Sequence, residues 1–185
     1  MRRTLIRISC SVAALGLVAS ASACGFDAQT LQPYQPSDGV NLNVGTAPDG
    51  NPDAGTAQVR GLMIIARGTN AGFLSASLTA RDQDTLTSVT GYLVNSDGTQ
   101  GPVIDVALPS GGISFGNGQL TVLTDLPEIT VTSSQLTPGL TADLTLTFAH
   151  AGSQSSQVPI VDGNSHTYAS VSPSPAASTS PATQG

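Results

Sequence analysis

Residues able to do chemistry are few in this sequence of 185 residues, and they are widely spaced. It contains 2 His, 2 Cys, 2 Met and no Trp. His150 follows the last strongly alternating segment and His166 lies in a polar tail, with no Cys or cluster of carboxylates beside either. Because a lone imidazole makes a poor metal site, we interpret both as exposed turn residues. Met63 lies in an apolar run and is predicted to fill the core.

One loop has the alternating oxygen-bearing side chains of a calcium site. Residues 49–55 read DGNPDAG. An EF-hand loop requires Gly at its sixth position and Glu at its twelfth, and this chain has Ala54 and Arg60 there. We therefore interpret the segment as a Pro- and Gly-rich loop.

Three carboxylates near predicted strands could in principle do acid–base work. Asp82 and Asp84 lie in a loop before a strand, and Asp105 is isolated on the wet face of another. General acid–base catalysis needs shifted pKa values and a partner group, and no His or nucleophile accompanies these residues in the sequence. We interpret them as solvated, and we predict no catalytic residue, no metal ligand, no cofactor and no enzyme activity.

Alternation of apolar and polar residues with period 2 predicts β-strands along the middle of the chain. The clearest case is 140–148, LTADLTLTF, in which Thr and Asp separate apolar residues. The predicted strands are 59–65, 74–80, 86–94, 104–108, 118–124, 129–133, 140–148 and 158–161. About eight short strands, each with one wet face, and no helix beyond the amino-terminal segment predict an antiparallel sandwich. An open barrel is the runner-up, since alternation does not fix how sheets close.

The composition divides the chain into four parts. Residues 1–23 are predicted to be a lipoprotein signal peptide, 24–58 a Gly- and Pro-rich tether, and 59–162 the β-domain. Within the tether, residues 34–44 have enough apolar character to pack along the domain. Residues 163–185, rich in Ser, Pro, Ala and Thr, are predicted to be a disordered tail, because they bury too little apolar surface to offset chain entropy.

The amino terminus has the layout of a secretory signal. Three Arg within residues 1–7 precede a short apolar stretch, which is too short for a membrane span of about 20 residues. The sequence ASAC, 21–24, resembles a bacterial lipobox, although Ala21 replaces the usual Leu. We predict cleavage before Cys24, lipidation of its thiol and attachment to the extracytoplasmic face of the cell membrane. The alternative is cleavage after A-x-A, which would release a soluble protein.

The charge of the processed chain excludes one class of partner. Removing residues 1–23 leaves three Arg against 12 acidic residues, a net charge of −9. Such a chain is repelled by nucleic acid and by anionic lipid, so membrane attachment would depend on the lipid on Cys24. Cys10 is lost with the signal, which leaves no intramolecular disulfide.

Several segments resemble the PCu(A)C family of periplasmic copper chaperones, in the divergent branch found as lipoproteins of high-GC Gram-positive bacteria. The resemblance covers about 100 residues and rests on RDQDTLTSV (81–89), PGL (138–140), LTLTF (144–148), VPIV (158–161), YQP (34–36) and GVN (39–41). It implies a Greek-key sandwich of the cupredoxin or immunoglobulin-like kind. The family's copper pattern, H-x₁₀-M-x₂₁-H-x-M, is missing: its late His-x-Met pair would fall near 128–131, which reads EITV, and 86–106 has neither His nor Met.

We therefore predict a lipid-anchored, extracytoplasmic β-domain that acts without chemistry, as a binding or interaction module with a protein partner in the envelope that the sequence does not name. The alternative is a copper or other metal chaperone with a degenerate or reorganised site that uses His150, His166 or carboxylates.

Overall fold

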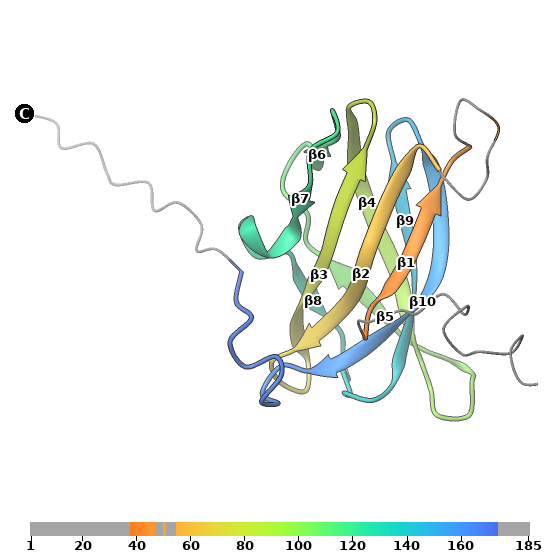
Figure 1. Ribbon diagram of the computed structural model, residues 1–185. Helices are drawn as coiled ribbons and strands as arrows, with labels where there is room; N and C mark the ends of the chain where they lie inside the picture. The colour runs from red at the N-terminus through yellow and green to blue at the C-terminus, as the bar shows by residue number, and fades with distance from the viewer. Residues whose placement is uncertain (1–37, 47–49, 51–54, 174–185) are drawn as a thin grey trace, which may run out of the picture. The chain divides into compact units, whose positions relative to one another are not determined.

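The computed structural model describes residues 38–46, 50 and 55–173, and nearly all of its regular structure is β (Figure 1). The strands are β1 Val40–Val44, β2 Ala57–Ala66, β3 Ala71–Ala80, β4 Asp84–Val94, β5 Gln100–Val106, β6 Ile113–Phe115, β7 Thr121–Val122, β8 Thr130–Thr132, β9 Thr141–Phe148 and β10 Gly152–Asp162. Within these residues the only helical element is a 3₁₀ turn, Leu123–Asp125. The predicted all-β class is confirmed.

Seven strands close into a barrel in the order β2, β10, β9, β4, β5, β8, β3 and back to β2. Every neighbouring pair around the ring is antiparallel except β10 and β2, where Ile160–Asp162 run parallel to Ile64–Ala66. The predicted antiparallel sandwich is therefore wrong in its closure and in one strand direction, and the open barrel is wrong because β2 pairs with β3. Alternation fixes which face of a strand is buried, but neither its partner nor its direction.

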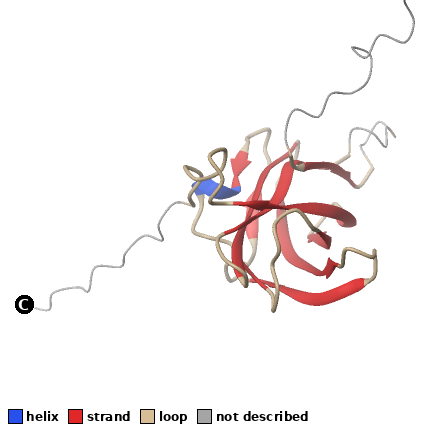
Figure 2. Cartoon of the chain, turned by 90° about the horizontal axis from the view of Figure 1, so that it is seen from below, coloured by secondary structure: helices blue, strands red, loops and turns tan. Residues whose placement is uncertain are grey.

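Three further strands extend this barrel: β1 pairs with β2, β6 with β4 and β7 with β3. Figure 2 shows the strands curving around a common interior, with the 3₁₀ turn to one side. The interior is filled by the apolar residues of the alternating segments, such as Ala142, Leu144, Leu146 and Phe148 on β9. The predicted strand 118–124 is shorter than expected, since only Thr121 and Val122 pair before the chain turns.

Five consecutive residues of β2, Leu62–Ala66, are all buried, because both faces of the strand are covered beyond a bulge. The register shifts at Gly61, which has φ +63°, a conformation that favours glycine. Beyond the bulge Leu62, Ile64 and Ala66 face the interior, whereas Met63 and Ile65 join a separate outer cluster with Phe73 of β3. Met63 is thus buried as predicted, but outside the barrel interior.

Residues 163–171 cover this outer cluster, and we call them the strap. Tyr168 and Val171 of the strap pack against the cluster. The guanidinium of Arg67 donates hydrogen bonds to the carbonyls of Gly163, Tyr168 and Val171. Its carbon lies 5.5 Å from the centre of the Phe73 ring, a cation–π contact. The prediction of a disordered tail from residue 163 is therefore wrong for the strap, because Arg67 and the outer cluster supply contacts that composition does not reveal.

The predicted tether also contains ordered structure. Val40–Val44 form β1, and β2 begins at Ala57, so 24–58 is not a tether throughout. Arg60 joins the two strands: its Nη1 donates to the Leu42 carbonyl at 2.8 Å and its Nη2 to Asn43 Oδ1 at 2.7 Å. The packing expected of residues 34–44 takes the form of strand pairing where the chain is described.

Several predictions concern residues that the structure does not describe. The signal peptide, Cys24 and most of the 49–55 loop lie outside the described residues. Among the residues that are described, no helix is long and apolar enough to cross a membrane.

Candidate functional site

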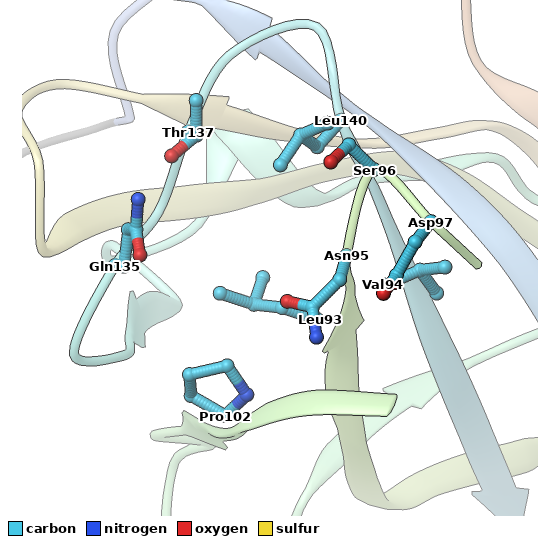
Figure 3. A pocket seen from close by; sticks show the side chains of 9 residues that line it. All are labelled: Leu93, Val94, Asn95, Ser96, Asp97, Pro102, Gln135, Thr137 and Leu140. Carbon is cyan, nitrogen blue, oxygen red and sulfur yellow. The ribbon is translucent and has the colours of Figure 1, made fainter. Parts of the chain in front are cut away.

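A pocket of about 290 Å³ opens at the end of the barrel where β4 turns into β5 (Figure 3). It lies between that turn and the 134–140 loop that precedes β9. Leu93, Leu140 and Pro102 form its apolar part. Its remaining lining residues are Val94, Asn95, Ser96, Asp97, Gln135 and Thr137. Such a mixture of an apolar patch and a few polar groups is typical of ligand sites, although this pocket is at the small end of their usual volumes.

Three polar side chains at the pocket are free to bind a ligand. The amide of Gln135 and the hydroxyls of Thr137 and Ser96 make no hydrogen bond with the residues that the structure describes. Figure 3 shows Gln135 and Thr137 on one wall, with Leu93 and Pro102 nearby. Sequence analysis missed this site, because its residues come from two separate turns and carry no catalytic signature.

Asp97 is the only charged residue that lines the pocket, and its carboxylate is already engaged. Oδ1 accepts hydrogen bonds from the Thr99 hydroxyl at 2.6 Å and the Thr99 N–H at 3.0 Å. These bonds, with the hydroxyl contributing most, lower the pKa of Asp97. Asp97 is therefore ionised at neutral pH and fixes the turn.

At the opposite end of β4, Asp84 is buried, with 4% of its surface exposed, which corrects the prediction that it is solvated. Its carboxylate accepts hydrogen bonds from the N–H groups of Thr85, His150 and Ala151 at 2.7 to 2.9 Å. Burial has the largest effect on its pKa and raises it, but these N–H groups and the charge of His150 outweigh burial and lower the pKa overall. Asp82 and Asp105 are exposed as predicted.

His150 is exposed as predicted and touches Asp84. Its Nδ1 lies 3.3 Å from Asp84 Oδ1, and its side chain is 78% exposed. A His held by a carboxylate through Nδ1 can serve as a general base if a nucleophile contacts Nε2. Within the described residues, none makes that contact by a hydrogen bond.

One sequence motif near Asp84 was overlooked in the sequence analysis. Residues 112–116 read GISFG, which has the G-x-S-x-G spacing of a nucleophile elbow. An elbow requires a turn from strand to helix, whereas Ser114 is the middle residue of the strand β6, paired with Thr85. Because β6 and β9 flank β4 on opposite sides, Ser114 is two strand spacings, roughly 9.5 Å, from the β9 side that leads to His150. The motif is therefore part of a strand.

The two histidines of the alternative prediction are far apart, and so is the one Met among the described residues. His150 precedes β10 and His166 follows it, and an 11-residue strand spans roughly 36 Å. Met63 lies under the strap in the outer cluster. Among the described residues, no group of three or more His, Cys, Asp or Glu could hold a metal ion. Where the family resemblance would place a His-x-Met pair, Ile129 and Val131 are buried core residues.

No protein-family model matches the sequence, and no curated protein matches it significantly. Among solved structures, the chain is similar to the copper-bound PCuAC domain from PmoF2, at 15% sequence identity and a TM-score of 0.45. The match covers 66% of this chain and 98% of that domain. The copper is bound by that domain, and no site residue is transferred from it to this chain.

Proposed function

We propose that this protein is a lipid-anchored binding module of the cell envelope that acts without catalysis. The observation that supports binding is the pocket between the β4–β5 turn and the 134–140 loop, where the side chains of Gln135, Thr137 and Ser96, which have no partner among the described residues, lie around an apolar patch. The titratable pair at the other end of β4 is used to hold a turn, which supports a function without chemistry. The sequence ASAC, 21–24, supports the anchor.

Metabolic labelling with a fatty-acid analogue tests the anchor. We expect the wild-type protein to take up label and to sediment with membranes, because two or three acyl chains on Cys24 gain roughly 0.8 kcal/mol per buried CH₂ group. Cys24→Ala should abolish both, whereas Cys10→Ala, which changes only the predicted signal, should leave both intact. A labelled, membrane-bound Cys24→Ala protein would contradict the anchor.

Titration with Cu(I) under reducing conditions tests the alternative of a metal chaperone, with the full chain carrying Cys10→Ala and Cys24→Ala, because free thiols bind Cu(I) themselves. A single exposed imidazole cannot supply the several soft ligands that Cu(I) prefers, so we expect binding weaker than micromolar. Tighter binding that is lost in His150→Ala would replace the binding-module proposal with a metal-transfer function.

A further inference from the structure

We propose that the pocket recognises small uncharged N-acyl groups, in which a secondary amide carries a methyl group. This inference rests on the proposed binding function and names the ligand chemistry of the same site. Such a group could come from an N-acetylated amino sugar or from an alanine-containing peptide, and both present the same amide and methyl.

The charges around the pocket disfavour an anionic ligand. Of its nine lining residues none is Arg, Lys or His, so a phosphate or carboxylate would find no counter-charge. The one charged group, Asp97, would repel an anion, and its Oδ1 is occupied by Thr99. The net charge of −9 predicted for the processed chain adds to this repulsion.

The apolar part of the pocket fits a methyl group better than a sugar ring. Leu93 is 4% exposed and lies beside Pro102 and the partly buried Leu140. No aromatic side chain lines the pocket, so a pyranose ring has no face on which to stack. With a volume of about 290 Å³, the site admits one sugar unit or one or two amino-acid residues rather than a drug-sized molecule.

The polar groups match both ends of a secondary amide. The Gln135 side chain offers an NH₂ donor and a carbonyl acceptor in one plane, the complement of an amide C=O and N–H. The Thr137 hydroxyl can donate or accept beside it. Since neither side chain is bonded to the described residues, a ligand can replace the water on both without breaking a hydrogen bond among those residues.

The test is an NMR titration of the full chain, purified in detergent, with three probes. N-acetylglucosamine and N-acetylalanine methylamide carry the acyl amide, whereas glucosamine has the same ring with a charged amine instead. We expect at least one acylated probe to shift the methyl signals of Leu93 and Leu140 and to bind at least tenfold more tightly than glucosamine. Saturation by the sugar alone would assign a glycan source, and saturation by the methylamide alone a peptide source.

A pair of variants separates the pocket from the rest of the surface. Gln135→Leu removes the amide from an exposed position and should weaken the acylated probe about three- to tenfold, the usual worth of one hydrogen bond. Gln119→Leu, exposed beside β6 at the other end of β4, should leave binding unchanged. Any of three results would overturn the proposal. Glucosamine could bind as tightly as the acylated probes, neither acylated probe could shift the methyl signals, or Gln135→Leu could bind the acylated probe as tightly as the wild type. Each of these results is independent of whether Cys24 takes up fatty acid. The proposal about the ligand and the proposal about the lipid anchor can therefore be contradicted separately.

Discussion

The carboxylate of Asp84 acts on the β9–β10 turn as a capping side chain acts on a helix end. It accepts the N–H groups of His150 and Ala151, which lie between the two strands. Buried backbone donors without partners are costly, so one carboxylate at the start of β4 lets the hairpin turn tightly. Its burial is explained by this structural role.

Asp84→Asn should lower the free energy of unfolding by about 2 kcal/mol, because an amide has one acceptor oxygen and would turn its NH₂ group toward N–H donors. Urea denaturation at pH 7 measures the loss. His150→Ala is the matched control, since the backbone N–H of residue 150 remains and the removed side chain is largely exposed. A loss as large in the control would assign the stability to the imidazole instead.

The same carboxylate should make stability depend on pH. The pKa of Asp84 is lowered below 3.8 in the folded protein, so its contribution is fully present above the unfolded pKa and is lost as pH falls through the folded value. The difference in unfolding free energy between wild type and Asp84→Asn should therefore shrink as the pH is lowered below about 4. A difference that stays constant from pH 7 to pH 3 would show that the carboxylate charge does not contribute.

At the scale of elements, the strap is an ordered segment that the amino-acid composition does not predict. Its turn is closed by backbone bonds to Ser165 and Tyr168, and the Gly163 N–H donates to the Ala66 carbonyl at 2.9 Å. Burial raises the pKa of the Tyr168 hydroxyl, and so does its hydrogen bond to Asp38; the value is about 12. The strap therefore contacts β2, the outer cluster and Asp38, which lies two residues before β1.

Two truncations measure what the strap contributes. Ending the chain after Asp162 removes the strap and exposes Met63, Ile65 and Phe73, which should cost several kcal/mol at about 25 cal/mol for each Å² of apolar surface exposed. Ending it after Pro173 removes only residues beyond the strap and should leave thermal stability unchanged. Equal melting temperatures for the two proteins would show that the strap covers the cluster without stabilising the barrel.

Sequence patterns predict strands where a strand has one buried and one exposed face, and they do not predict the other parts of the fold. The alternation of 140–148 predicted β9 almost to its ends, because its Thr and Asp face solvent. β1 was missed because VNLNV is short and lies among Gly, Pro and Asn, and β6 because three residues are too few to show a period. The pocket was beyond prediction, since Leu93 and Gln135 line it from β4 and from the 134–140 loop, which are far apart in the sequence.

At the scale of the whole molecule, one seam of the barrel is a short parallel contact. β10 meets β2 over three residue pairs, whereas its contact with β9 extends over eight. The carbonyl of Ile160 also accepts the Gly139 N–H, and its own N–H donates to the Leu140 carbonyl. The loop that carries the pocket residues Gln135 and Thr137 is thus fixed to the seam of the barrel, so the pocket and the closure are built together.

The hydrogen bond between Tyr168 and Asp38 places the first and last described parts of the domain side by side. A domain whose ends are adjacent tolerates circular permutation and insertion into another protein. A short Gly- and Ser-rich linker can join residue 173 back to residue 38, and the chain can be reopened at the exposed turn 109–111, away from the pocket, to give a circular permutant. The same adjacency suits the barrel to insertion as a cassette within a surface loop of a carrier protein.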